Sequence, residues 1–293
     1  MSIRGVIGNC VGFILVLCWR LLSFGRRSDN ILSIYFHNPN KDVFLNCVSF
    51  LQRRGYTFIS EDQLIEKFNN KDESNKKNVF ISLDDAWSNN LLNVFPIILD
   101  KKIPVTLFTP IEPLKDGVLW LKYFRKADEK ILTKYLIGSN LDIKKIPNNE
   151  RVIILKELKK QYSFEREIMS IDDLLKLKQH NRYVKIGGHT YSHPILTQCD
   201  SNTIKSELHE AKKVLENLTK EEVNSIAYPN GDYNNDVLKC VKYSGYKLAF
   251  TTEQRMLNIT SDKLFKLPRF CIPDNYGKYE SIARMLGIWS KIF

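Results

Sequence analysis

Segments that read as buried strands alternate with segments that read as amphipathic helices from residue 31 to residue 270. Residues 31–36 and 78–83 are predominantly apolar runs, whereas residues 42–54 repeat apolar side chains at helical spacing and end at Gly55. Strands that are separated by helices pair in parallel within one sheet. The alternation therefore predicts an α/β fold around a parallel sheet, which is either open or closed into a barrel.

A long connection interrupts this alternation between the strand expected at residues 105–108 and the helix that begins at Ser170. Residues 120–167 are polar and mostly helical in pattern, and they are too many for a simple connection. We interpret them as a helical insertion over one face of the fold. A barrel can hold a chain of this size as one domain, so residues 30–293 are expected to form a single catalytic domain.

The first 29 residues form a separate hydrophobic segment. Residues 5–19 are nearly all apolar, and Arg20, Arg26 and Arg27 follow them. The apolar run is shorter than the roughly 20 residues of a spanning helix. A secretory signal peptide, a signal anchor, an interfacial helix and a buried first helix of the globular domain all remain open. We favour attachment of residues 1–27 to the inner (cytoplasmic) membrane, and the positive-inside rule then places the catalytic domain in the cytoplasm.

Charge and cysteine usage narrow the classes of partner. The 44 basic and 33 acidic residues give a formal net charge of +11, which favours an anionic partner. Because the excess is spread along the chain rather than clustered, we expect phospholipid head groups or an acidic glycan and no nucleic acid. The six cysteines contain no CxxC pair and are expected to be free thiols, which mildly favours a reducing compartment.

Polar side chains that can carry chemistry follow several predicted strands at their carboxyl ends. These residues are His37, Asp84, Asp85, His189, Tyr228 and Arg269. The carboxyl ends of parallel strands meet at one end of an α/β barrel, where active sites form. The agreement between the strand ends and these side chains predicts a catalytic barrel.

A metal site can be read from the histidines and aspartates. His189 and His193 are four residues apart, a spacing that on one helical turn directs both imidazoles at one point. With one carboxylate from the Asp84 and Asp85 pair, they would bind a divalent metal and leave positions for water and a substrate oxygen. The other carboxylate would be a general base. Taken separately, Asp85 could cap the next helix, and the histidines could be unrelated loop residues.

Three segments in order resemble the successive motifs of the polysaccharide deacetylase superfamily, the NodB-homology domain. They are SLDDAWSN at 82–89, GGHTYSHP at 187–194 and AYPNG at 227–231. The resemblance covers residues 30–273 apart from the insertion. It implies a distorted (β/α) barrel and a metal-dependent hydrolase that removes N-acetyl, sometimes O-acetyl, groups from sugars.

The resemblance assigns the metal site by position. Asp85, His189 and His193 match the family's metal ligands, and zinc is the default ion for such nitrogen and oxygen ligands. Asp84 matches the general base, and Arg269 would hold it as a carboxylate through a charge-assisted hydrogen bond.

The remaining roles are implied at two further positions. The residue after the motif proline, Asn230, would donate its backbone N–H to the oxyanion. The chain has no histidine after His209, so it lacks the late histidine of many members. Tyr35–Asn38 instead resembles the rearranged poly-N-acetylglucosamine deacetylase branch, in which a first-strand histidine, here His37, protonates the departing nitrogen.

These features predict a hydrolase of cell-surface glycan biosynthesis that acts on an N-acetylated glycan or a lipid-linked sugar. A deformylase or amidase on a lipid-linked sugar would use the same chemistry, and a degenerate glycan-binding partner is a further alternative. Two histidines and one carboxylate also occur in non-haem Fe(II) oxygenases, but those usually have β-sandwich folds, and the alternation of strands and helices argues against one.

Overall fold

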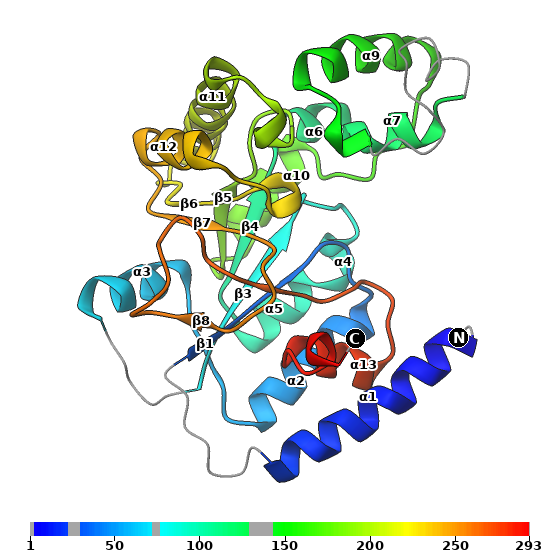
Figure 1. Ribbon diagram of the computed structural model, residues 1–293, viewed down its shortest axis with the longest axis vertical. Helices are drawn as coiled ribbons and strands as arrows, with labels where there is room; N and C mark the ends of the chain where they lie inside the picture. Colours follow the sequence, from blue (N-terminus) through cyan, green and yellow to red (C-terminus); the bar gives the residue numbers. More distant parts are fainter. Residues whose placement is uncertain (1–2, 23–29, 72–76, 129–142, 293) are drawn as a thin grey trace.

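A computed structural model describes residues 3–22, 30–71, 77–128 and 143–292. A curled sheet lies at its centre, and helices pack around it (Figure 1). The strands are β1 (Asn30–Phe36), β2 (Thr57–Phe58), β3 (Asn78–Asp84), β4 (Val105–Thr109), β5 (Val184–Gly188), β6 (Ser225–Ala227), β7 (Leu248–Phe250), β8 (Leu257–Asn258) and β9 (Phe270–Cys271).

The helices connect these strands and cover the outside of the sheet. They are α1 (Ile3–Leu22), α2 (Lys41–Arg53), α3 (Glu61–Asn70), α4 (Asn90–Asn93), α5 (Phe95–Lys101), α6 (Ile111–Asp116), α7 (Trp120–Lys126), α9 (Asn148–Gln161), α10 (Ile171–His180), α11 (Ser201–Thr219), α12 (Asn235–Tyr243) and α13 (Lys278–Met285). Short 3-10 turns are η1 (Ile143–Lys145), η2 (Leu196–Gln198), η3 (Pro229–Gly231) and η4 (Trp289–Lys291).

The sheet is parallel and nearly closes on itself. Its order is β7–β6–β5–β4–β3–β1–β8, and only the β1–β8 pair is antiparallel. Residues 264–272 join its two sides, because Leu267 donates its backbone N–H to the carbonyl of Ala249 in β7 while Phe270 pairs with Ile34 of β1. The predicted α/β fold with a distorted barrel-like sheet is confirmed.

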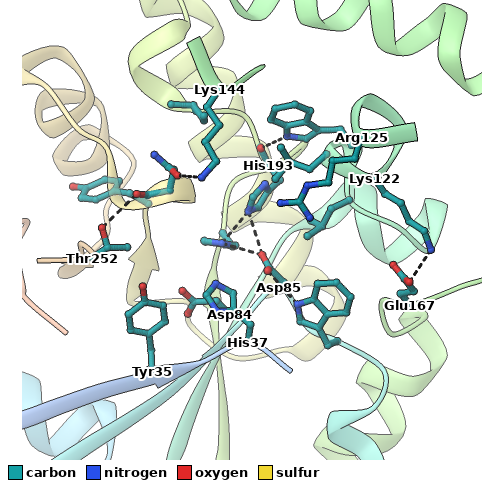
Figure 2. Close-up of a pocket in the computed structure, with 18 of the residues that line it drawn as sticks. Tyr35, His37, Asp84, Asp85, Lys122, Arg125, Lys144, Glu167, His193 and Thr252 are labelled. Carbon is teal, nitrogen blue, oxygen red and sulfur yellow. Dashed lines mark hydrogen bonds and ion pairs between the residues drawn. The ribbon is translucent and has the colours of Figure 1, made fainter. Parts of the chain in front are cut away.

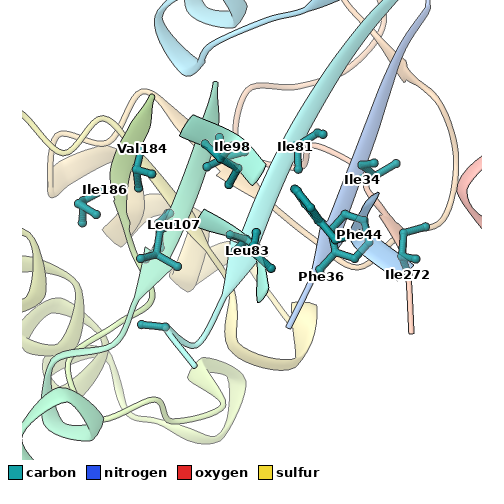
Figure 3. Packing of buried hydrophobic residues seen from close by; sticks show 14 of the residues in the cluster. Ile34, Phe36, Phe44, Ile81, Leu83, Ile98, Leu107, Val184, Ile186 and Ile272 are labelled. Atoms are coloured by element: carbon teal, nitrogen blue, oxygen red, sulfur yellow. The ribbon is translucent and has the colours of Figure 1, made fainter. Parts of the chain in front are cut away.

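Side-chain alternation along β3 separates the core from the inside of the barrel. Ile81 and Leu83 face the helices and pack in the main apolar cluster (Figure 3). Phe80 faces the other way and stacks on Phe250, with ring centroids 5.1 Å apart and planes at 5°. Asp84 is an even number of residues from Phe80, so its carboxylate points into the barrel at the carboxyl end of the strand.

Two element predictions were wrong in detail. The single helix expected at residues 88–101 is split into α4 and α5 at Val94, whose φ is −119°. Pro96 lies in the first turn of α5 and has no N–H to continue a helix from α4. Residues 265–270 read as one strand in the sequence, but the structure reduces this strand to the two residues of β9, because the segment before Phe270 pairs with β7 in a single isolated bridge, between Leu267 and Phe250.

The hydrophobic N-terminal segment forms α1, which packs along α13 (Figure 1). A Cβ atom on Gly12 would lie 2.5 Å from the backbone nitrogen of Glu280, so glycine permits this close approach. Asn9 accepts a hydrogen bond from the backbone N–H of Tyr279 at 2.9 Å. Among the described residues, we find no helix with the length and apolar character needed to cross a membrane. Arg26 and Arg27 lie outside the described residues.

The predicted insertion is helical where the structure describes it. Helices α7 and α9 share an apolar cluster of their own that includes Trp120, Phe124 and Leu158. This unit projects from the end of the sheet where the strands β3, β4 and β5 finish (Figure 1). Residues 129–142 of the predicted insertion are not among those described.

Candidate active site

A pocket of about 790 Å³ opens at the carboxyl ends of the strands. Figure 2 shows it, with side chains from the strand ends below and from the insertion above. The predicted residues that line it are His37, Asp84, Asp85, His189, His193 and Asn230. The structure therefore brings together six residues that are up to 193 positions apart in the sequence (230 − 37).

Three potential metal ligands converge within this pocket. The Nε2 atoms of His189 and His193 lie 3.3 Å and 3.2 Å from Oδ1 of Asp85, and 3.2 Å from each other. All three residues are buried. Burial by itself raises the pKa of Asp85, but the interactions with the two histidines outweigh it and hold that pKa well below its ordinary value.

The geometry of these atoms fits a metal ion. Oδ1 of Asp85 is buried and has no hydrogen-bond donor, although two imidazole nitrogens face it. His189 has its Nδ1 atom 2.8 Å from the carbonyl of Ala227, an arrangement in which Nδ1–H donates and Nε2 keeps its lone pair for a metal. Ligand atoms roughly 2.0–2.1 Å from a tetrahedral zinc ion lie about 3.3 Å apart, which matches the observed spacing. Within the described residues, this is the group whose ligand atoms are placed to hold a metal.

The backbone around the site adopts a conformation that side-chain-bearing residues usually avoid. Positive φ angles occur at Asp85 (72°), Ala86 (57°), Thr190 (65°), His193 (58°) and Asn230 (62°). Each costs of order 1 kcal/mol relative to the right-handed region. The clustering of left-handed residues in the three motifs means that the surrounding structure holds these loops in the positions from which their side chains reach the pocket.

Close packing beneath the histidine segment requires both of its glycines. A Cβ atom on Gly187 would lie 2.5 Å from the Phe108 ring, and one on Gly188 would lie 2.6 Å from the Tyr246 hydroxyl. β5 can therefore lie close against the neighbouring side chains. The two glycines in the sequence predict this close packing, which fixes the point at which His189 leaves the sheet.

Asp84 is paired with a buried arginine instead of facing the ligands. Arg269 donates from Nη1 and Nη2 to the two carboxylate oxygens at 2.8 and 2.9 Å. The guanidinium is fully buried and lies 4.2 Å from the centroid of the Tyr35 ring. It also donates to the Ser82 hydroxyl at 2.9 Å. This two-point pairing fixes the orientation of the Asp84 carboxylate.

His37 follows β1 and reaches the same pocket. Its ring packs edge-on against Tyr35, with centroids 5.4 Å apart, and its backbone carbonyl accepts a hydrogen bond from Asn90 at 2.8 Å. Burial alone lowers the pKa of His37, but a hydrogen bond with Cys271 and the negative charges of Asp85 and Asp84 raise it to about 9. These interactions favour the protonated form of the imidazole.

Asn230 lies across the pocket from His37 on η3. Its side-chain oxygen accepts a hydrogen bond from Lys144 at 2.5 Å, and its amide nitrogen donates to Asp232 at 2.6 Å. Because side-chain contacts hold Asn230 in its left-handed conformation, its backbone is fixed at the pocket edge. The roles of His37, Asn230, Asp84 and Arg269 stay predictions.

Several contacts that support the site escaped the sequence analysis. The Trp87 indole donates to Asp85 Oδ2 at 3.2 Å, and the Trp120 indole donates to the carbonyl of His193 at 2.7 Å. Glu207 accepts hydrogen bonds from the backbone of Tyr191 and Ser192, both at 2.8 Å, and so anchors the loop between the histidines. The sequence did hold a signal for Glu207. This acidic residue follows Ile204 by three residues on α11, so it lies on the same side of the helix as that buried side chain. No local pattern marks the two tryptophans as donors.

Comparisons with known proteins agree with this fold and indicate its family. Residues 120–249 match the polysaccharide deacetylase family, a range that includes both histidines of the site. A poly-beta-1,6-N-acetyl-D-glucosamine N-deacetylase of Staphylococcus aureus is 25% identical over 263 residues, which cover 85% of this chain and 76% of the relative. The chain contains a polysaccharide deacetylase domain and is a hydrolase of this class.

Solved structures of deacetylases share this fold. The deacetylase PplD of Streptococcus pyogenes has a TM-score of 0.61 at 20% identity and covers 87% of this chain and 97% of that one. IcaB from Ammonifex degensii has a TM-score of 0.59 at 13% identity, with 89% and 98% covered. These values show a shared fold. Together with the Staphylococcus aureus relative, they confirm the resemblance to the poly-N-acetylglucosamine deacetylase-like branch.

Proposed function

We propose that this protein is a metal-dependent deacetylase that hydrolyses the N-acetyl group of an amino sugar in a cell-surface glycan. The observation that carries the proposal is the convergence of Asp85, His189 and His193 at 3.2–3.3 Å beside the paired carboxylate of Asp84. Zinc is the ion that best suits one carboxylate and two imidazoles at this spacing. When bound there, the ion polarises the acetyl carbonyl and makes water more acidic.

The residues around the ligands have separate tasks in this proposal. Asp84, oriented by Arg269, takes the proton of the attacking water. The backbone N–H of Asn230 donates to the carbonyl oxygen as negative charge develops on it. His37 gives its proton to the departing nitrogen, because an unprotonated amine is a poor leaving group. The products are acetate and a free amino sugar.

The test is product release from matched substrates by the full chain loaded with zinc. We expect acetate from N-acetylglucosamine oligosaccharides, and less from O-acetylated ones. Release of formate from an N-formyl amino sugar at a higher kcat/KM would make the protein a deformylase instead. Zinc binding without turnover of any of these substrates would overturn the catalytic proposal and favour a glycan-binding partner.

The proposed role of His37 predicts a basic limb in the pH profile. A group that must be protonated supports full activity below its pKa, and activity falls as the pH rises through it. The pKa of His37 is raised to about 9, and a divalent ion beside Asp85 would offset part of this rise. We therefore expect kcat/KM to fall within the range from roughly pH 6.5 to 9.

His37→Ala should lower kcat by about 10²–10⁴-fold and remove this limb. The matched control is His180→Ala, which alters an exposed histidine on α10. A basic limb that survives unchanged in His37→Ala would assign the proton donor elsewhere.

We also propose that α1 attaches the protein to the cytoplasmic face of a membrane. The face of α1 opposite α13 exposes Val6, Ile7, Ile14 and Leu17, while the half-exposed Phe13 packs against Tyr279 of α13. Apolar side chains of this kind, followed in the sequence by Arg20, Arg26 and Arg27, are typical of an interfacial helix.

Co-sedimentation with anionic phosphatidylglycerol vesicles tests this attachment. Binding of the full chain should fall at least about tenfold in Ile7→Asp/Ile14→Asp, because each aspartate must be withdrawn from the interface. Ile153→Asp on α9 is the matched control, because Ile153 is as exposed as Ile7, at 59%. Equal binding by all three proteins would remove α1 from any membrane role.

A further inference from the structure

One wall of the catalytic pocket is cationic, and it comes from the insertion. Lys122 and Arg125 on α7 and Lys144 on η1 line the same pocket as the three ligands. Figure 2 shows Lys144 above Asp85 and Arg125 beside His193, with His37 lower down; Lys122 lies farther to the right and runs toward Glu167. The wall therefore faces the space that a sugar must occupy when its acetyl group is at the ligands.

The three cations differ in how they are already partnered. Lys122 pairs with Glu167 at 2.7 Å, and it points away from the ligands (Figure 2). Lys144 donates to the side-chain oxygen of Asn230 at 2.5 Å. The described part of the chain offers Arg125 no ion pair or hydrogen bond, and its guanidinium points into the pocket toward His193 (Figure 2).

Among the described residues, two further carboxylates line this pocket. Away from the Asp84 and Asp85 pair, the carboxylates that line the pocket are Glu167 and Asp274. Glu167 is the partner of Lys122, and Asp274 accepts the backbone N–H of Asn38 at 2.9 Å on the far side, near His37. An exposed arginine with an open fork of donors suits a bidentate contact to a phosphate or a carboxylate.

We infer that the substrate of this pocket is an acetamido sugar that carries an anionic group, a phosphate or a carboxylate, bound by Arg125. This rests on the proposed deacetylase function and names its class of substrate. A neutral polymer of N-acetylglucosamine would gain little from the wall. Its deacetylated product would be positively charged and would be repelled by it. An anionic sugar is attracted to the cationic wall before the reaction. After the reaction, its negative charge compensates the positive charge of the new amino group.

The experiment compares three probes with the zinc-loaded full chain. They are N-acetylglucosamine 1-phosphate, a disaccharide of N-acetylglucosamine and glucuronate, and neutral di-N-acetylchitobiose. Both kcat/KM for acetate release and Kd by calorimetry are measured for each. We expect at least one anionic probe to be preferred over chitobiose by about 10- to 100-fold, as a charged hydrogen bond provides. Which of the two is preferred separates a phosphorylated sugar from a uronate-containing glycan.

Arg125→Glu should reduce this preference by about 10- to 100-fold. Lys126→Glu is the matched control, because it makes the same change of charge at the next residue of α7, which is exposed and outside the pocket lining. Lys126→Glu should leave the preference unchanged.

The outcomes separate this inference from the proposed function. Turnover of all three probes without an anionic preference would overturn the inference and leave the deacetylase intact. An anionic preference that Arg125→Glu and Lys126→Glu leave equally intact would also overturn it, because the metal alone would then be binding the anion. Binding of an anionic probe that depends on Arg125, without turnover, would support the cationic wall and contradict the deacetylase. Absence of any binding and turnover would overturn both.

Discussion

Asp84→Asn is expected to lower kcat for acetate release by about 10²–10⁴-fold while zinc remains bound at the parent's stoichiometry. The substitution keeps the shape of the side chain but removes the base. Asp84 is not a ligand in the observed geometry, because both of its oxygens face Arg269 at 2.8–2.9 Å. Metal analysis and acetate release on the same preparation measure the two effects.

The same substitution leaves the fully buried Arg269 charge without a carboxylate, so a stability effect must be separated from the catalytic one. Loss of one partner of a buried ion pair costs about 3–5 kcal/mol in the free energy of unfolding. Asp84→Asn/Arg269→Met should recover part of that stability, because the stranded charge is gone, and should stay inactive. Asp236→Asn, a change at an exposed residue paired with Lys239, is the control. Activity of Asp84→Asn within tenfold of the parent, with zinc bound, would show that the base is another group.

The His189→Ala/His193→Ala variant should lose zinc, and with it all turnover. The parent should contain close to one equivalent of divalent metal, because three protein atoms converge on one point. Removal of two of them leaves Asp85 alone, which cannot retain the ion through purification. A ligand that binds only the native state also raises stability, by about 4 kcal/mol at a concentration 1,000 times its Kd. Zinc should therefore raise the Tm of the parent and leave that of the variant unchanged.

The chain offers a matched control for this experiment. His180 and His209 are exposed histidines on α10 and α11, and His180→Ala/His209→Ala removes the same number of imidazoles without touching the pocket. This variant should bind zinc as the parent does. A parent that takes up no zinc, cobalt or nickel would contradict the metal site and, with it, the hydrolytic proposal.

Much of the scaffold was predictable because its causes are local in the sequence. The sequence predicts a capping box at Ser60 and Gln63 and a capped helix start at Ser170, and both caps form, since each joins residues three apart. The parallel pairing of β1 with β3, and of β3 with β4, follows from the helices between them. Pro96 interrupts the helical pattern of residues 88–101, and the structure accordingly has two helices there, α4 and α5.

The candidate site was predictable to the extent that parallel strands end together. His37, Asp84 and His189 each follow a strand, so the topology alone brings them to one end of the barrel. The contact between Arg269 and Asp84 spans 185 positions and was expected only from the family resemblance. No local rule links these two residues.

The sequence by itself determined the class of fold, the end of the sheet that holds the chemistry and the types of ligand, because periodicity and strand ends are properties of neighbouring residues. Only the tertiary structure decided what surrounds those ligands. Lys122, Arg125 and Lys144 read as solvated helix faces in the sequence, yet the insertion folds back over the strand ends and places them in the pocket wall. Likewise, α1 meets α13 across the whole chain through Gly12 and Glu280. Such contacts depend on how distant elements pack, which no pattern of neighbouring residues encodes.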